Sequence, residues 1–313
     1  SSWILNAGQE GTFVANETAQ GNTDANGIGD FYYTPPSGFL ALCSANLPDT
    51  TLSPNQSTQA DDHFNTVLWT GNASNTHQIT GVGFQPDWVW IKERTNASSH
   101  YLIDSSRGLG TGDSFRALLS DNTDAEYTAL NDQLRTLDSD GFTLDDNTDT
   151  NFYVNRNSQT YVAWNWKANG GTTSSNTDGT ITSTVQANTT AGFSIVLYTG
   201  TGSNGTIGHG LGKVPKWILI KERNGTRNWI VYHAKNTSAP ETEYLHINKT
   251  LATQDSAVFW NDTAPTSSVI SLGTGGAVNF SGNTYVAYVF AEIEGYSKFG
   301  SYVGNSDSDG SFV

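Results

Sequence analysis

The sequence of 313 residues contains one cysteine and no methionine, and only 14% of its residues are charged. The single cysteine, Cys43, cannot staple the chain, and we expect it to be a buried small apolar residue. No apolar run approaches the roughly 20 residues of a membrane-spanning helix, so no membrane insertion is expected. Only 15 Lys and Arg stand against 30 Asp and Glu. The net charge of −15 therefore argues against nucleic acid as a partner, because phosphate contacts need clustered cations.

The chain is instead rich in glycine and in aromatic residues, with 32 Gly and nine Trp. Glycine supplies turn geometry, and Trp, Tyr and Thr suit pleated strands. We therefore predict an all-β protein with little helix, built from tandem β-sandwich modules of the jelly-roll or concanavalin type.

One strand-like stretch occurs twice. The run GFQPDWVWIKER over residues 83–94 returns as GKVPKWILIKER over residues 212–223, 129 residues later. Such a close repeat indicates a tandem array. In each copy a proline precedes alternating aromatic and β-branched residues, which is the pattern of a strand.

The repeats divide the chain. Residues 1–52 form a first unit and residues 53–63 a linker. Residues 64–169 form the first full repeat, followed by a linker or hairpin at 170–192 and by the second repeat at 193–295. Residues 296–313 begin a third repeat or add a closing strand. We further expect residues 38–42 to be a buried strand and residues 257–260 to be an additional strand.

The run FYYTPPSGFLALC at residues 31–43, with NLP at 46–48, resembles the C-terminal end of a SPRY-like, concanavalin-type sandwich found in tail and fibre proteins of marine phages. Both repeats resemble an uncharacterised β-rich domain of marine phage virion proteins. The matching runs are YTG at 198–200, GHGLG at 208–212, VPK at 214–216, DSDGF at 138–142 and TYVAW at 160–164. The resemblance implies a structural virion component and supplies no catalytic residue.

Four tryptophans are the candidates for carbohydrate binding: Trp88, Trp90, Trp164 and Trp166. Residues two apart in a strand point to the same face, so Trp88 and Trp90 share one face and Val89 and Ile91 the other. Exposed aromatic rings on a sandwich could stack on sugars. Alternatively, the same rings build a core or a contact between domains.

A calcium site is the candidate metal centre. Asn22, Asp24 and Asn26 place oxygen ligands at alternate positions before Gly27, and Asp30 follows at a ninth position, as in calcium loops. The twelfth position carries no glutamate, and an Asn/Asp/Gly turn explains the same pattern. The run NSDSDG at residues 305–310 repeats its beginning. No cofactor other than calcium is expected.

Catalytic patterns are weak. None of the six histidines has a metal-ligand spacing, and the two copies differ at His209 and His233. Acidic pairs for glycoside cleavage could come from Asp145, Asp146 and Asp149 or from Glu241 and Glu243, all in polar loops. We therefore predict that the chain is not an enzyme.

The repeated Lys-Glu-Arg runs at residues 92–94 and 221–223 are either exposed strand ends or recurrent contacts with a neighbouring domain or subunit. Function is expected where the two copies differ, in the loops at residues 108–149 and 237–276.

The leading hypothesis is a non-enzymatic virion structural protein, fibre or tail/capsid-associated. It would lie on the surface of the particle and contact other virion proteins and host surface glycans. It would also self-assemble as a homo-oligomer, for example a trimer. The alternatives are a secreted bacterial adhesin or carbohydrate-binding module, which would be extracellular, and a polysaccharide depolymerase.

Overall fold

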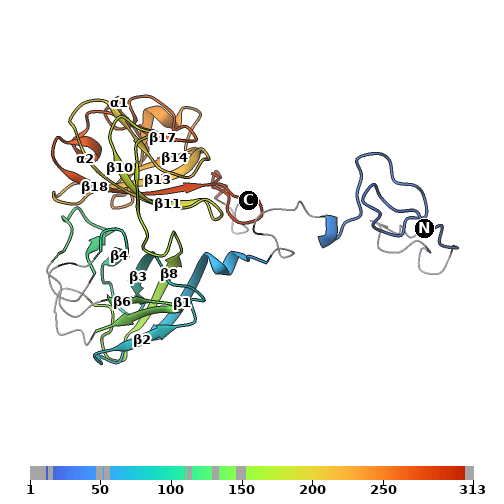
Figure 1. The fold of residues 1–313 in the computed structure, drawn as a ribbon, viewed down its shortest axis with the longest axis horizontal. Helices are drawn as coiled ribbons and strands as arrows, with labels where there is room; N and C mark the ends of the chain where they lie inside the picture. Colours follow the sequence, from blue (N-terminus) through green and yellow to red (C-terminus); the bar gives the residue numbers. More distant parts are fainter. Residues whose placement is uncertain are drawn as a thin grey trace. The chain divides into compact units, whose positions relative to one another are not determined.

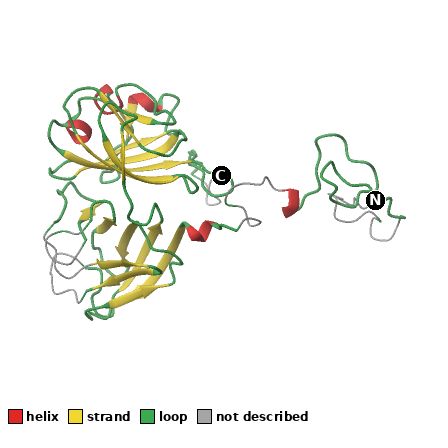
Figure 2. Ribbon diagram, viewed as in Figure 1, coloured by secondary structure: helices red, strands yellow, loops and turns green. Residues whose placement is uncertain are grey.

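The computed structural model describes residues 12, 17–46, 52, 57–108, 110, 115–128, 134–145 and 153–306. The chain forms two compact units, Ser1–Thr58 and Gln59–Val313, and each is described by itself. Strands dominate the second unit and helices are few and short (Figure 2). The prediction of an all-β fold with little helix is confirmed. Within the described ranges, no helix is both long enough and apolar enough to span a membrane.

The described part of the first unit contains the 3-10 helix η1 (Ser44–Asn46) and an isolated β-bridge between Asn22 and Phe31. The prediction of a buried strand at residues 38–42 is wrong. Phe39 and Leu42 are 68% and 86% exposed, and Cys43 is exposed rather than buried. The physical reason is that this segment pairs with no neighbouring strand among the described residues, so its apolar side chains have no sheet against which to pack.

The first sandwich of the second unit follows the 3-10 helix η2 (Ala60–Asp62) and has two antiparallel sheets. The larger sheet runs in the order β1 (Phe64–Thr70), β8 (Thr160–Trp166), β3 (Trp88–Glu93), β4 (His100–Asp104) and β5 (Ala117–Leu119). The smaller sheet runs in the order β2 (His77–Thr80), β7 (Gly141–Leu144) and β6 (Leu134–Asp138). A core of buried apolar residues joins them, among them Val89, Ile91 and Phe142.

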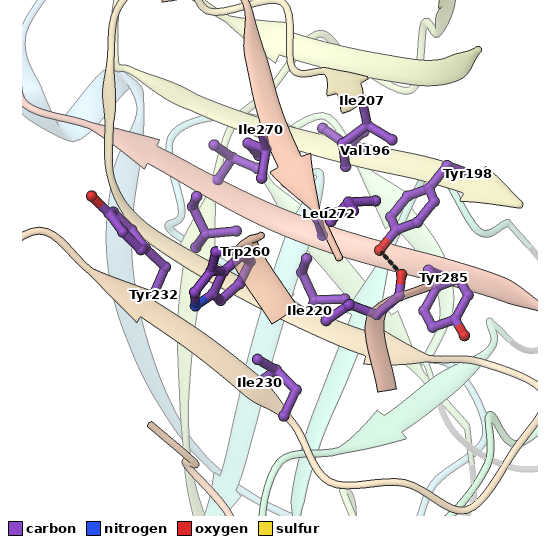
Figure 3. Packing of buried hydrophobic residues seen from close by; sticks show 14 of the residues in the cluster. Val196, Tyr198, Ile207, Ile220, Ile230, Tyr232, Trp260, Ile270, Leu272 and Tyr285 are labelled. Atoms are coloured by element: carbon purple, nitrogen blue, oxygen red, sulfur yellow. Dashed lines mark hydrogen bonds between the residues drawn. The ribbon is translucent and has the colours of Figure 1, made fainter. Parts of the chain in front are cut away.

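The second sandwich is built around a six-stranded sheet. Its order is β14 (Ile230–His233), β13 (Pro215–Glu222), β18 (Thr284–Ala291), β11 (Phe193–Thr199), β10 (Ser183–Asn188) and β9 (Ser174–Asn176). The other elements are β12 (Gly205–Gly208) paired with β17 (Val269–Leu272), η3 (Pro240–Thr242), β15 (Glu243–Tyr244) paired with β16 (Gln254–Asp255), α1 (Ala257–Trp260) and α2 (Gly276–Asn279). Ile220, Ile230 and Leu272 lie in its core (Figure 3).

Two segments bear on the predicted boundaries. Residues 170–192 contain the hairpin β9–β10, which extends the sheet of the second sandwich through β11. The expected strand at residues 257–260 is instead the helix α1, which ends at Asn261 in the left-handed conformation (φ 52°). This single helical turn places Trp260 in the core, where it is 1% exposed. The apolar run is therefore buried without forming a strand. Residues 298–306 form no strand, so the described part of the C-terminal segment adds none to the sheet.

The repeated stretch forms β3 and β13, and each strand is buried on both faces. Val89 and Ile218, at matching positions, point into the cores of their own sandwiches. Trp88 and Leu219 point the other way, into a third core that lies between the two large sheets. Figure 1 shows β11, β13 and β18 facing β3, β4 and β8 across this layer. The two repeats are therefore one compact unit and not separate modules on a linker.

A buried carboxylate fastens the connection between the sandwiches. Both oxygens of Asp87, just before β3, accept hydrogen bonds from the backbone N–H groups of Ala168, Gly170 and Gly171, at 2.7–2.9 Å. Asp87 is fully buried. Lys216 stands at the matching position of the second copy, so this contact belongs to the first copy alone.

Candidate functional site

The four predicted tryptophans lie together on the face of the first sandwich that meets the second. Trp88 is fully buried, and its ring lies against Tyr288 with the centroids 4.2 Å apart. No face of Trp88 is open to a sugar. Trp90 and Trp164 are half-buried and meet edge to face, with centroids 6.3 Å apart. The period-two pattern thus identified one shared face, and that face is mainly a contact between the sandwiches.

Trp166 reaches a surface cleft at the edge of this contact. The cleft has a volume of about 230 Å³ and is almost entirely apolar. Its other lining residues come from both sandwiches and from the segment after β18: Phe64, Ala191, Phe193, Trp217, Phe290, Tyr296, Ser297 and Phe299. Sugars need hydrogen-bonding partners around an aromatic platform, and this cleft offers very few. It is therefore poorly suited to a saccharide.

In each repeated Lys-Glu-Arg run, the lysine stabilises the turn that follows its strand. Lys92 Nζ donates to the backbone oxygens of Glu93, Asn96 and Ser98, at 2.7–3.3 Å. Lys221 Nζ makes the corresponding bonds to the backbone oxygens of Glu222 and Gly225. The expectation of exposed strand ends is wrong for Glu93, Lys221 and Glu222, since all three are at least 98% buried.

The Lys-Glu-Arg run of the second copy also contacts the first sandwich, as the alternative prediction of a contact with a neighbouring domain expected. Lys221 Nζ lies 3.3 Å from the Thr123 oxygen of the first sandwich. Arg223 donates to both carboxylate oxygens of Glu126, at 3.0 and 2.8 Å. Arg94, the matching residue of the first copy, is exposed. Burial lowers the pKa of Lys221 to about 8, although Glu222, Asp124 and Glu126 favour its charged form.

Glu126 belongs to a buried ion network at this boundary. Arg107 donates to Glu126 Oε1 at 3.0 Å and to Asp104, which also accepts a 2.7 Å hydrogen bond from the Tyr288 hydroxyl. Burial opposes charge on both Glu126 and Arg107. The neighbouring opposite charges outweigh it, so the pKa of Glu126 is lowered and that of Arg107 is raised. Every charged group here has a partner, which suits a structural connection better than a reacting centre.

The candidate calcium loop is a hydrogen-bonded turn in the structure. Asp24 Oδ1 accepts from the N–H groups of Asn26 and Ile28, and Oδ2 accepts from the N–H of Ala41 and from Asn46 Nδ2, at 2.6–3.0 Å. Burial would raise the pKa of Asp24, but these four donors hold it at about 2.

The other predicted calcium ligands form hydrogen bonds within the chain or are partly buried. Asn22 Nδ2 donates to the Phe31 and Tyr32 oxygens, and Asn26 Nδ2 donates to Asn46 Oδ1. Asp30 is half-buried. No group of three or more His, Cys, Asp or Glu able to hold a metal occurs in the described part of the chain. Of the repeated run at 305–310, Asp307, Asp309 and Gly310 lie outside the described residues.

Of the acidic candidates for glycoside cleavage, Asp145 and Glu243 have partners in the structure. Asp146 and Asp149 lie outside the described residues, and Asp145 is buried with Arg135 Nε 3.6 Å from its carboxylate. Glu243 accepts from Asn236 Nδ2 and from the Thr237 hydroxyl. Among the histidines, His209 is buried, with Nε2 3.2 Å from the Thr266 oxygen.

A second cavity, here called the Tyr244 pocket, has the mixed lining that the apolar cleft lacks. Its volume is about 450 Å³, and apolar and polar groups contribute comparably to its surface. It is lined by Thr123 of the first sandwich and, from the second, by Thr226, Arg227, Asn228, Ile230, Tyr244, His246, Lys249, Leu251, Gln254, Val258, Phe259, Gly275, Gly276 and Ala277.

The aromatic wall of the Tyr244 pocket is held in place by its own contacts. The rings of Tyr244 and Phe259 lie with centroids 4.3 Å apart, and the Tyr244 hydroxyl donates to Gln254 Oε1 at 2.9 Å. His246 packs edge-on against Tyr244, with centroids 5.2 Å apart. Tyr244 and Gln254 sit on the paired strands β15 and β16, so backbone hydrogen bonding fixes the wall.

The pattern of residues did not single out Arg227, Tyr244 or Lys249. One sequence signal was available, because most of the pocket falls in or beside the loop at residues 237–276, where the copies differ. Ser98 occupies the position that matches Arg227, so the first copy has no equivalent of the pocket's arginine.

Neither a comparison with curated proteins nor one with solved structures found a significant match. A family profile, described as a domain of unknown function (DUF7483), matches residues 59–313. The matched range spans both sandwiches, and it begins where the second compact unit begins. The chain therefore belongs to the DUF7483 family.

Proposed function

We propose that the chain is a non-enzymatic structural protein that binds a saccharide in the Tyr244 pocket. The observation that carries this proposal is the composition of the pocket. It combines aromatic and aliphatic side chains with the amides of Asn228 and Gln254 and the hydroxyl of Thr226. Sugar rings present apolar C–H faces together with hydroxyl groups, and such a mixed, concave surface suits both.

The joined sandwiches support a structural role. A third core and a buried ion network connect them, and Thr123 of the first sandwich contributes to the wall of the pocket. A binding site on such a frame loses little freedom when it takes up a ligand, because its parts are already positioned.

The setting that we propose is the surface of a virion, as a fibre or a tail/capsid-associated protein in contact with host glycans. Its basis is the resemblance of the repeats to phage virion domains, together with the acidic net charge. A secreted adhesin or carbohydrate-binding module would use the same pocket and is the alternative. Immunogold electron microscopy of particles distinguishes them, since absence of label on virions would exclude the virion setting.

The binding function is tested by screening the full chain on a glycan array and measuring the best ligands by titration calorimetry. Tyr244→Phe removes the hydroxyl that orders Gln254, and we expect affinity to fall about fivefold. Tyr302→Phe is the matched control, because Tyr302 is 69% exposed and does not line the pocket. Absence of binding to any glycan would refute the function. Shortening of a bound oligosaccharide by the chain would instead identify a depolymerase.

A further inference from the structure

The Tyr244 pocket differs in charge from the rest of the chain. The whole sequence has twice as many acidic as basic residues, 30 against 15. The lining of the pocket includes Arg227, Lys249 and His246 and contains no Asp or Glu. A ligand in the pocket therefore meets positive side chains without competing carboxylates on the lining.

Arg227 is oriented by a contact behind the pocket. Its Nε lies 2.8 Å from Oε2 of Glu222, which is 2% exposed. Glu222 is itself held by Asn283, whose Nδ2 donates to Oε1 at 2.7 Å. Neither Nη1 nor Nη2 of Arg227 has a hydrogen-bond partner in the described part of the chain. These two groups are the fork with which arginine binds a carboxylate or a sulfate in two parallel hydrogen bonds.

Gly276 makes room for this guanidinium. A Cβ atom at position 276 would lie 2.9–3.2 Å from Cζ, Nη1 and Nη2 of Arg227. A side chain at position 276 would therefore push the guanidinium away from this position.

His246 and Lys249 line the same wall of the pocket. His246 Nδ1 lies 2.7 Å from the backbone oxygen of Trp229, which can only accept, so Nδ1 carries a proton. Its Nε2 has no partner within the described ranges. Lys249 is exposed, and its ammonium group is likewise without a protein partner there.

We propose that the Tyr244 pocket selects acidic saccharides, whose carboxylate or sulfate group is bound by the Nη1–Nη2 fork of Arg227 with Lys249 as a second cationic contact. This inference rests on the proposed saccharide-binding function and names its ligand class. A uronic acid and a sulfated sugar share the chemistry, and the experiment separates them.

The test uses the full chain and three probes of known composition: trigalacturonate, a carrageenan-derived tetrasaccharide that carries sulfate but no carboxylate, and neutral chitotetraose. Binding is measured by titration calorimetry in 50 mM and 300 mM salt. We expect one of the two acidic probes to bind at least tenfold more tightly than chitotetraose. Arg227→Gln should weaken that binding about 10- to 100-fold, as expected for loss of charge-assisted hydrogen bonds.

Arg227→Gln leaves Glu222 without its cation, and such a variant can fail to fold. Lys249→Gln then provides the second test of the cationic contacts. It should weaken acidic binding several-fold and leave the affinity for chitotetraose unchanged. Arg94→Gln, the same change at an exposed arginine outside the pocket, should have no effect. Equal affinity for neutral and acidic probes, unchanged in both pocket variants, would overturn the acidic specificity and leave saccharide binding standing. Failure of all three probes, and of the glycan array, would overturn both.

Discussion

Arg223 Nη2 lies 2.8 Å from Glu126 Oε2, so the end of the second repeated strand is paired with a carboxylate of the first sandwich. The backbone repeats the connection, because the N–H of Glu126 donates to the oxygen of Arg223 at 2.6 Å. Arg107 of the first sandwich shares the same carboxylate. Arg116 of the first sandwich also lies 3.3 Å from Glu126 Oε2, so one glutamate pairs with arginines of both sandwiches.

Glu126→Gln should destabilise the second unit by about 3 kcal/mol, because it leaves the buried guanidinium of Arg107 and the half-buried ones of Arg116 and Arg223 without their common carboxylate. The measurement is the free energy of unfolding in guanidinium chloride. Arg94→Gln, at the exposed arginine of the first copy, should change it by less than about 0.5 kcal/mol. Equal effects of the two substitutions would contradict the structural role of the network.

Trp88→Ala should cost about 4 kcal/mol, since it removes a fully buried ring from the core between the large sheets. Trp164→Ala, on the same face but half-buried, should cost clearly less. Thermal and chemical unfolding of the two variants give the comparison. If the order were reversed, the packing of the sandwiches through Trp88 would be wrong.

Gly200→Ala should destabilise the second sandwich by about 2 kcal/mol, as overpacking against a backbone does. An added Cβ would lie 2.4 Å from the Phe280 oxygen, and a Cβ added at Gly71, the matching position of the first copy, would lie 2.1 Å from the Arg156 oxygen. Gly300→Ala is the control, because nothing lies within 4 Å of its Cβ position. A melting temperature for Gly200→Ala equal to that of the control would refute the close approach.

Stability should rise with pH between about 8 and 10.5 through Lys221. Burial lowers its pKa to about 8, against 10.5 in the unfolded chain. Between these values the unfolded chain holds a proton that the folded chain has lost, so raising the pH favours the folded state. Subtracting the curve of Lys221→Met isolates the effect. Parallel curves for the two proteins would show that folding does not lower the pKa of this amine.

Calcium should leave the first unit unchanged, because every oxygen of Asp24 already accepts two hydrogen bonds. Thermal unfolding in excess calcium and in excess chelator should agree within about 1 °C. A clear rise of the melting temperature in calcium, lost in Asp24→Asn, would restore the metal hypothesis, since a ligand that binds the folded state stabilises it.

Local pattern was sufficient for much of the fold. The alternation in the repeated stretch placed Trp88 opposite Val89, and β3 has this arrangement because successive side chains of a strand must point to opposite faces. The clearest local error was at residues 257–260, where a short apolar run reads equally well as a strand or as one helical turn. Only the fit of Trp260 into the surrounding core decides between them.

The sequence by itself determined an all-β chain with two copies of one strand. It also assigned the side chains of that strand to two opposite faces. Only the tertiary structure decided what covers each face of the repeated strand. The residue pattern of the strand is the same whether a second sheet or solvent lies against a given face. In the folded protein Trp88 and Lys221 are buried, although the residue pattern also allowed both side chains to be exposed. The tertiary structure also assembled the Tyr244 pocket from Thr123, Arg227, Phe259 and Gly276, which are far apart along the chain and meet only when the loops of the second sandwich fold against the first.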